Sequence, residues 1–112
     1  MNTSEKDIEK AKSGMRRGML EFCILLSIEP GRVYATDILT RLKTADLLVV
    51  EGTLYPLLTR LKTEGLLEYE WEESNSGPPR KYFTLTGKGR EHLAHLKQTW
   101  KSLNTSIQTL LS

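Results

Sequence analysis

The 112-residue sequence contains one cysteine, no long hydrophobic run and little net charge. A lone Cys23 cannot form an intramolecular disulfide, which favours a reducing, intracellular environment. No apolar segment approaches the roughly 20 residues of a membrane span, and the charged N-terminus lacks the layout of a signal peptide. These absences predict a cytoplasmic protein.

Sequence patterns for catalysis or metal binding are equally scarce. There is no Ser/His/Asp set, no phosphate-binding loop and no paired-carboxylate arrangement. His92 and His95 stand three residues apart, but no cysteine or carboxylate accompanies them at a spacing suited to zinc. Cys23 lies inside an apolar run, and we interpret it as an inert core residue. We therefore expect no enzyme, no metal site and no cofactor.

The composition is that of one folded domain, with 38% hydrophobic and 27% charged residues. The net charge of only +2 does not by itself indicate nucleic acid. The charges are unevenly placed, however, because the acidic run Glu68–Glu73 is followed by a mainly basic segment. Its cations are Arg80, Lys81, Lys88, Arg90, Lys97 and Lys101, with only Glu91 among them. A nearly neutral total can therefore conceal a basic surface.

The N-terminal quarter predicts a polar arm followed by an apolar helix. Residues 1–13 form the arm, and the sequence leaves open whether it is frayed or helical. The helix is expected from about Ser13 to Glu29, ended by Pro30-Gly31. Its segment Phe22–Leu26 is apolar on nearly every face, which favours burial against a partner chain as well as against the core.

A short strand and a second helix are predicted next. Arg32–Ala35 has the composition of an edge strand. Thr36-Asp37 supplies an N-cap pair for a helix that ends near Thr44. An apolar connector, residues 47–50, then leads into the following helix.

That following helix has the pattern of a DNA-recognition helix. Leucines recur at helical spacing along one face, at Leu54, Leu57, Leu58 and Leu61. Gly65 is placed to end the helix, and Pro56, tolerated in a first turn, puts its start near Glu51 to Thr53. The opposite face carries slim or hydrogen-bonding residues that can approach base pairs, at Gly52, Pro56, Thr59 and Thr63. An ordinary amphipathic helix with a solvated polar face is the alternative.

A β-hairpin is predicted directly after this helix. Residues 67–72 alternate strictly, with Leu67, Tyr69 and Trp71 on one face and three glutamates on the other, as in a half-buried strand. Residues 74–79 form a loop and residues 80–85 a second strand. A hairpin after a helix-turn-helix is the wing of a winged-helix domain. The predicted fold class is therefore α+β, mainly α, with a winged helix-turn-helix over residues 14–86.

The last helix, residues 87–112, is predicted to mediate dimerisation, with Thr86 as its cap. Its apolar residues follow alternating spacings of three and four, at Leu93, Leu96, Trp100, Leu103, Ile107 and Leu110. Burying each is worth about 1.5–3 kcal/mol, so six left in water would forfeit most of a typical stability of about 5–15 kcal/mol. We expect part of this seam to pack on the core and part to meet a second chain.

Two motifs resemble the signature of the PadR-type transcriptional regulators. The segment Glu51-Gly-Thr-Leu-Tyr-Pro-Leu-Leu-Thr-Arg-Leu-Lys-Thr-Glu-Gly-Leu-Leu67 is similar to the family pattern G-T-L-Y-x-x-L-x-R-L-x-x-x-G. The segment Gly77-Pro-Pro-Arg-Lys-Tyr-Phe-Thr-Leu-Thr-Gly-Lys-Gly89 is similar to the family's wing, G-x-x-R-K-Y-Y-x-L-T-x-x-G. Phe83 replaces the second tyrosine of the wing. The motifs occur in the family's order and separation, and the resemblance covers nearly the whole chain from about residue 14.

The resemblance implies a homodimer that binds a pseudo-palindromic DNA operator, usually as a repressor. It also implies a recognition helix in the major groove and a wing on the neighbouring backbone or minor groove. With one C-terminal helix, the chain is similar to the short subgroup of the family. Some short members bind planar aromatic compounds between paired C-terminal helices that each carry a tryptophan, and Trp100 matches that position.

The residues expected to contact DNA come from both motifs: Thr53, Tyr55, Pro56, Thr59, Arg60, Arg80 and Lys81. Hydroxyl groups near a helix start can bond phosphate, Arg60 can reach phosphate or a guanine edge, and the wing cations can reach phosphate or the minor groove. Alternatives are that Tyr55 packs against the wing as core and that Arg80 and Lys81 pair across the strands with Glu68–Glu72.

A small hydrophobic or aromatic effector is expected to contact Trp100, together with Met15, Met19, Phe22 and Leu96, because methionine suits an adaptable cavity. Ordinary packing is the alternative for each of these side chains. The resulting hypothesis is a homodimeric repressor that such an effector releases from DNA. Its rivals are a winged-helix protein-interaction module without operator binding and a ligand carrier without a DNA function.

Overall fold

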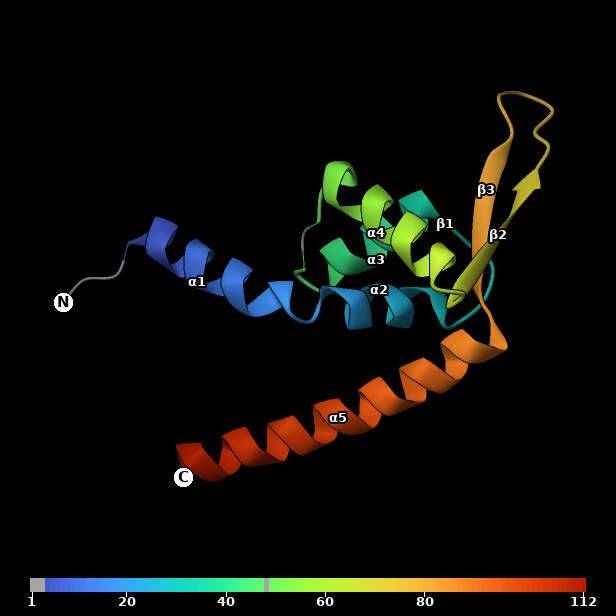
Figure 1. Ribbon diagram of the computed structural model, residues 1–112. Coiled ribbons are helices and arrows are strands. Elements are labelled where there is room, and N and C mark those ends of the chain that lie inside the picture. The colour runs from blue at the N-terminus through green and yellow to red at the C-terminus, as the bar shows by residue number, and fades with distance from the viewer. Residues whose placement is uncertain (1–3, 48) are drawn as a thin grey trace.

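The computed structural model describes residues 4–47 and 49–112. They form an elongated molecule of 56 × 32 × 21 Å, from which the hairpin, the first helix and the last helix all project (Figure 1). The helices and strands are α1 (Glu5–Arg17), α2 (Leu20–Ile28), β1 (Val33–Tyr34), α3 (Ala35–Thr44), α4 (Glu51–Thr63), β2 (Leu67–Glu72), β3 (Arg80–Leu85) and α5 (Gly87–Leu111). Residues 1–3 of the predicted arm and Leu48 of the predicted connector lie outside the described residues.

The three strands form an antiparallel sheet in the order β1-β3-β2. β2 and β3 pair along their whole length, from Leu67 opposite Leu85 to Glu72 opposite Arg80. β1 is a short edge strand that pairs with β3, and α3 begins directly after it. The predicted α+β fold, mainly helical and of the winged-helix type, is confirmed.

Helix α2 lies at the centre of the hydrophobic core. Its Ile24, Leu25 and Ile28 are fully buried, because α3 and the start of α5 contact it from different sides. The other buried apolar residues are Val33, Ile38, Leu42, Leu54, Leu58, Leu61, Leu66, Leu67, Phe83, Leu85 and Leu93. Each such burial is worth about 1.5–3 kcal/mol, so this cluster fixes α4 and the wing on one scaffold.

The single helix predicted from Ser13 to Glu29 is wrong, because the chain forms two helices that meet at Gly18 and Met19. α1 begins at Glu5, where the Ser4 hydroxyl accepts a 3.2 Å hydrogen bond from the backbone N–H of Asp7. No residue of α1 is buried. A glycine costs about 1 kcal/mol in a helix interior relative to alanine. The helix therefore breaks at Gly18, where α2 enters the core and α1 runs outward.

Three further details differ from the sequence prediction. Asp37 caps α3 from within the helix, since its carboxylate accepts a 2.8 Å hydrogen bond from the Tyr34 N–H, one residue before the helix starts. Pro56 lies in the second turn of α4, where it removes the N–H that would bond the Gly52 carbonyl. Trp71 is 61% exposed because β2 extends past the core, so the half-buried pattern holds only for the start of that strand.

Helix α4 ends as predicted at Gly65, which has a φ of 79°. The N–H of Gly65 donates to the Lys62 carbonyl and that of Leu66 to the Leu61 carbonyl. These two bonds form a Schellman motif, which satisfies carbonyls that the helix end leaves unpaired.

The start of α5 is bonded directly to this end of α4. The predicted cap Thr86 accepts a 2.9 Å hydrogen bond from the Gly89 N–H and donates a 2.6 Å bond to the Gly65 carbonyl. Lys88 Nζ donates to the Glu64 carbonyl at 2.9 Å. A change in the direction of α5 would therefore be passed to α4 through fixed hydrogen bonds.

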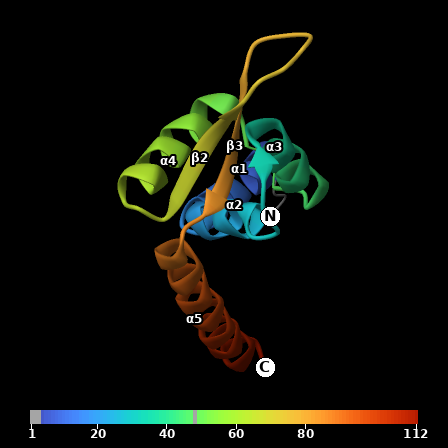
Figure 2. The ribbon, with the colours of Figure 1, turned by 90° about the vertical axis from the view of Figure 1, so that its right-hand side faces the viewer.

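Beyond this joint α5 leaves the domain. Figure 2 shows it projecting away from the sheet and the other helices, with the C-terminus at its far end. Within the residues described, no helix is long and apolar enough to cross a membrane.

Candidate nucleic-acid interface

A cleft of about 510 Å³ lies between α4 and the inner face of the wing. Its polar lining comes from α4, from the start of α3 and from the wing. These polar residues are Tyr34, Thr36, Tyr55, Thr59, Lys62, Thr63, Tyr69, Arg80 and Lys81. None of the residues that line it is aspartate or glutamate. A concave surface of hydroxyls and cations without a carboxylate suits a polyanion.

Helix α4 presents a row of hydroxyl groups to the cleft. The Thr59 hydroxyl donates to the Tyr55 carbonyl at 3.1 Å, and the Thr63 hydroxyl donates to the Thr59 carbonyl at 3.0 Å. Because each hydroxyl hydrogen is used inside the helix, the free lone pairs of these oxygens face outward as acceptors. They can accept from the amino groups of adenine or cytosine.

Tyr55 is 47% exposed and lines the cleft. The alternative that it packs as core is therefore wrong. Its position, one turn before Thr59 on the same flank of α4, leaves the phenol hydroxyl open to a ligand.

Arg80 is held at the base of the wing by two contacts. Its guanidinium lies 3.7 Å above the centre of the Tyr34 ring and donates to the Thr36 hydroxyl at 3.4 Å. Stacking on an aromatic ring is typical of arginine and leaves part of its donor fork free. Glu72, its cross-strand neighbour, pairs instead with Arg32 at 2.7 Å. Arg80 therefore remains available to an anion in the cleft.

Aromatic rings continue along the inner face of the wing. Tyr69 lies against the buried Phe83 with ring centres 6.0 Å apart and edge-on to Trp71 at 6.2 Å. Lys81 Nζ lies 4.2 Å and Lys62 Nζ 5.2 Å from the centre of the Tyr69 ring. One tyrosine therefore orients two ammonium groups, one from the wing and one from α4, toward the same space.

The outer face of the wing is fixed by tyrosine–carboxylate bonds. The Tyr34 and Tyr82 hydroxyls donate to Glu72 and Glu70, each at 2.6 Å. These hydrogen bonds raise the pKa of both phenols, since the neutral phenol is the donor. Arg32 lies 3.9 Å over the Tyr82 ring and completes the network. The acidic run of β2 thus orients the wing and lies on the sheet face opposite to Tyr69 and Lys81.

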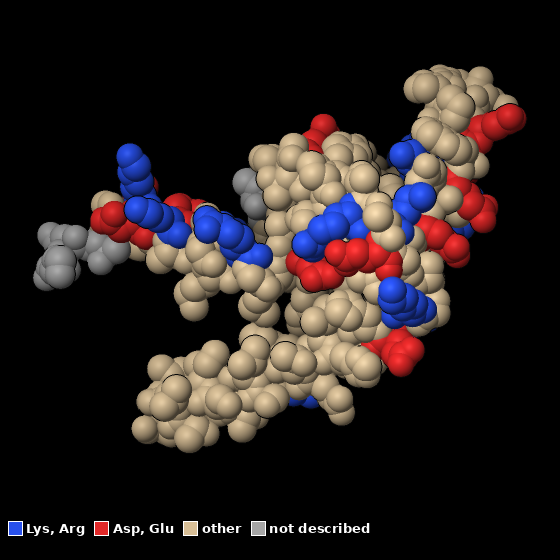
Figure 3. Space-filling view, in the orientation of Figure 1, with Lys and Arg blue, Asp and Glu red and all other residues tan. Residues whose placement is uncertain are grey.

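The surface charges are segregated in the same way. Figure 3 shows Lys and Arg over α4 and beside the wing, Asp and Glu in a band beneath them and along the wing itself, and no charge on the end of α5. A basic surface is therefore present despite the net charge of +2.

Three of the residues predicted to contact DNA do not line the cleft. Arg60 lies on the other flank of α4, with its guanidinium nitrogens 3.9 Å from a Glu21 oxygen and 3.8 Å from a Glu64 oxygen. Thr53 lines a different cavity, beside α1 and α2. Pro56 is exposed at the edge of α4 and absent from the cleft lining.

The cleft also includes residues that were not predicted to contact DNA. Lys62 belongs to it by helical spacing, because it follows Thr59 by three residues and Tyr55 by seven. That signal was available in the sequence. Tyr34 and Thr36 line the cleft because β1 and the start of α3 contact the wing in the folded chain. No local sequence pattern predicts their position there.

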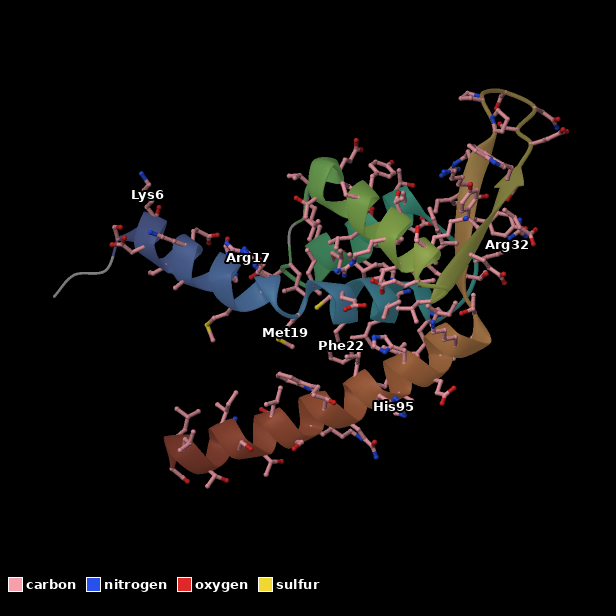
Figure 4. All side chains as sticks on the ribbon, viewed as in Figure 1. Lys6, Arg17, Met19, Phe22, Arg32 and His95 are labelled. Carbon is pink, nitrogen blue, oxygen red and sulfur yellow. The ribbon has the colours of Figure 1, made fainter. Side chains whose placement is uncertain are left out.

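The residues predicted to bind an effector are not gathered in one cavity of the chain. Met15 and Met19 line a second cavity between α1 and the α3–α4 connector, whereas Trp100 lines neither cavity. Phe22 and Leu96 pack at the edge of the core. In Figure 4, Met19 and Phe22 lie on the side of α1 and α2 that faces α5.

The residues of the predicted dimerisation seam differ in burial: the first two pack on the core of their own chain and the others are exposed. Leu93 is buried in the core of its own chain and Leu96 is half-buried. The rest is exposed, namely Trp100, Leu103, Ile107 and Leu110. Residues 102–112 carry no charged side chain. In a single chain, most of this seam is therefore exposed to solvent.

The sequence comparison decides the family. The model of the transcriptional regulator PadR-like family matches residues 24–95, which run from α2 through the wing into α5. The chain belongs to the PadR-like family of transcriptional regulators. It is therefore a DNA-binding regulator and not an enzyme, as the sequence predicted.

Solved structures support the same assignment. The PadR-like transcription factor from Bacteroides fragilis is 56% identical, with a TM-score of 0.77, over 90% of this chain and 98% of that one. A PadR-like regulator from Bacillus cereus is 40% identical, with a TM-score of 0.79, over 89% and 98% of the two chains. A PadR-family regulator from Eggerthella lenta is 29% identical, with a TM-score of 0.86, over 96% and 95%.

Proposed function

We propose that this PadR-like regulator is a homodimeric repressor that grips its operator in the cleft between α4 and the wing. The observation that carries the proposal is the carboxylate-free cleft, which is lined by hydroxyls of α4 and by Arg80 and Lys81 of the wing. Operator binding would keep the protein with the DNA in the cytoplasm.

The cleft suggests a division of roles among its residues. Tyr55 and Thr59 would face base edges in the major groove, with Thr59 accepting from an amino group. Arg80, Lys81 and Lys62 would bond phosphates and set the register of the domain on the duplex. Thr53, Pro56 and Arg60 would lie outside this contact, unless the duplex extends past the start of α4.

The exposed seam of α5 supports a second copy as the dimer partner. Four apolar side chains of the seam are exposed beyond Leu96, and residues 102–112 have no charged side chain that would repel an identical helix. Pairing through this seam would hide them in the manner of a coiled coil. Two α4 helices would then present themselves to successive turns of the DNA.

Release by a small hydrophobic or aromatic ligand would act through the joint between α4 and α5. A ligand shifts such an equilibrium only if it binds two spacings of the paired α4 helices with different affinity. The Thr86, Lys88 and Gly65 bonds would carry a change at α5 to α4. Trp100 remains the proposed ligand contact between two such helices.

The test is binding of Arg80→Ala to a DNA fragment from upstream of its own gene, measured by fluorescence anisotropy. Loss of a charge-assisted contact in each protomer should weaken binding at least about tenfold. Arg60→Ala is the matched control, because it removes the same side chain from the opposite flank of α4, and it should stay within about twofold. Equal losses in the two variants would contradict the cleft as the binding surface.

The same experiment distinguishes a DNA-binding repressor from its main rival, a winged-helix protein-interaction module. A protein-interaction module would leave the wild-type chain without salt-dependent binding to any fragment of that region. Detection of such binding, with the expected order of the two variants, excludes that rival.

A further inference from the structure

The second cavity, beside α1, has no role in the operator contact. It has a volume of about 500 Å³, within the range of about 300–1,000 Å³ typical of small-molecule sites. Its apolar wall is formed by Met19, Leu20, Cys23, Leu47, Val49 and Val50. No aromatic ring lines it, so the wall consists of flexible or branched aliphatic and sulfur-containing side chains.

Cations of α1 also line this cavity. They are Lys12, Arg16 and Arg17, and no aspartate or glutamate is among the described residues that line it. Figure 4 shows Arg17 near the corner where α1 meets α2. Among the described residues, the Arg16 guanidinium has one hydrogen-bond partner, the neutral Ser13 hydroxyl at 3.3 Å. Its donor fork is therefore free to bind a carboxylate.

The outer wall of the cavity is tied in place. Lys12 Nζ lies 2.7 Å from a carboxylate oxygen of Asp46, in the α3–α4 connector. Asp46 has a φ of 61°, in the left-handed region that residues other than glycine seldom adopt. The ion pair thus joins α1, which lines the cavity, to a constrained turn.

We propose that this cavity binds a free medium-chain fatty acid, with the acyl chain against the apolar wall and the carboxylate on Arg16 and Arg17. Charge complementarity selects an anionic amphiphile, because Arg16 and Arg17 form no ion pair among the described residues, whereas Lys12 is already paired with Asp46. The absence of aromatic rings in the lining favours an aliphatic chain over a planar ring. The site lies within one protomer and is distinct from the proposed ligand contact at Trp100.

The cavity also touches the start of the DNA-contacting helix. Val50 is the N-cap of α4 and Thr53 lies in its first turn, and both line the cavity. A bound acyl chain would therefore contact the end of α4 that lies opposite to the α5 joint. This regulatory consequence rests on the proposed function, whereas fatty-acid binding itself does not.

Cys23 gives a direct measure of occupancy, because it is the only cysteine of the chain and lines the cavity. The experiment measures the rate of Cys23 alkylation by iodoacetamide as decanoate is added below micelle formation, without DNA. We expect saturable protection of at least about fivefold. Decyltrimethylammonium, with the same chain length and opposite charge, should protect far less.

The role of Arg16 and Arg17 in holding the carboxylate is tested with the double variant Arg16→Gln and Arg17→Gln. It should bind decanoate about tenfold more weakly, since it loses charge-assisted donors. Lys6→Gln with Lys10→Gln is the matched control, because it removes the same charge from α1 outside the cavity and should leave the affinity unchanged. All four positions are on the surface helix α1, where no residue is buried, so folding is preserved.

Three results would overturn the proposal: no protection by decanoate, equal protection by the cationic amphiphile, or equal weakening by the two double variants. Protection that depends on protein concentration and not on decanoate would also overturn it, because a second copy would then fill the cavity. A parallel anisotropy measurement with operator DNA separates the two proposals, since decanoate can protect Cys23 whether or not the chain binds DNA.

Discussion

Gly89 is the residue at which α5 comes closest to the rest of the domain. A Cβ atom at this position would overlap the carbonyl oxygen of Leu66, which is backbone and cannot move aside. The same carbonyl accepts the Thr86 N–H at 3.1 Å. The glycine therefore permits the contact through which the proposed dimer helix directs α4.

We predict that Gly89→Ala destabilises the protein by about 1–3 kcal/mol or more, as is usual when a close-packed site is overfilled. Urea unfolding followed by circular dichroism measures the change. Gly87→Ala is the control, because a Cβ there meets no atom within 4 Å, and its effect should be small. A loss of stability equal to that of the control would show that Leu66 and α5 can separate without cost.

At the scale of single elements, the wing is held by bonds between tyrosine hydroxyls and carboxylates. The hydrogen bond to Glu72 raises the pKa of Tyr34, and the hydrogen bond to Glu70 raises that of Tyr82. A raised phenol pKa means that the folded state favours the neutral form. The two hydrogen bonds therefore make their full contribution to the free energy of unfolding below the unfolded phenol pKa of about 10. This contribution is lost as the pH rises through the pKa of the folded state.

We predict that Glu70→Gln lowers the pKa of Tyr82 toward its ordinary value. An ultraviolet absorbance titration of tyrosinate measures it, and the difference between this variant and its Tyr82→Phe partner isolates the one phenol. Glu68→Gln is the control, since that carboxylate lies on the same face of β2 without a tyrosine hydrogen bond among the described residues. An unchanged titration in Glu70→Gln would mean that the Tyr82–Glu70 bond does not persist in solution.

Helix α5 is the element on which the quaternary proposal depends. Leu103→Glu with Ile107→Glu should abolish dimerisation, because burial of each side chain is worth about 1.5–3 kcal/mol and a symmetric dimer loses four of them. The dissociation constant should rise by about four orders of magnitude or more. Sedimentation equilibrium measures it.

The control for this prediction is Gln98→Glu with Thr105→Glu, which adds the same charge at two exposed positions on the opposite side of α5. This variant should remain dimeric. If both double variants stay dimeric, the contact between copies lies elsewhere on the molecule.

At the scale of the whole molecule, affinity for DNA should depend on salt through the cations of the cleft. Each phosphate contact contributes about 0.9 to the slope of log K against log salt. Lys62→Ala should therefore reduce the slope by about 2 for a dimer, one contact from each protomer. Anisotropy titrations across a salt series measure the slope, and Lys43→Ala, an exposed lysine of α3 outside the cleft lining, should leave it unchanged. Equal slopes in the two variants would exclude Lys62 from the phosphate contact.

The local features of this protein follow from short stretches of its sequence. Strict alternation specified the first strand of the wing, leucines at helical spacing specified α4, and Gly65 and Thr86 specified where helices end and begin. Each of these signals acts over a few residues, through backbone geometry or a single hydrogen bond. The two motifs together also identified the family before any tertiary contact was known.

Only the tertiary structure decided which flank of α4 faces the wing. At about 100° per residue, Arg60 and Lys62 lie on opposite flanks, and helical spacing alone favours neither. The buried leucines of α4 set its rotation, which turns Lys62 into the cleft and Arg60 toward Glu21. The exposure of Trp71 and the cavity beside α1 were settled in the same way. These features depend on how separate elements pack, which no short stretch of sequence encodes by itself.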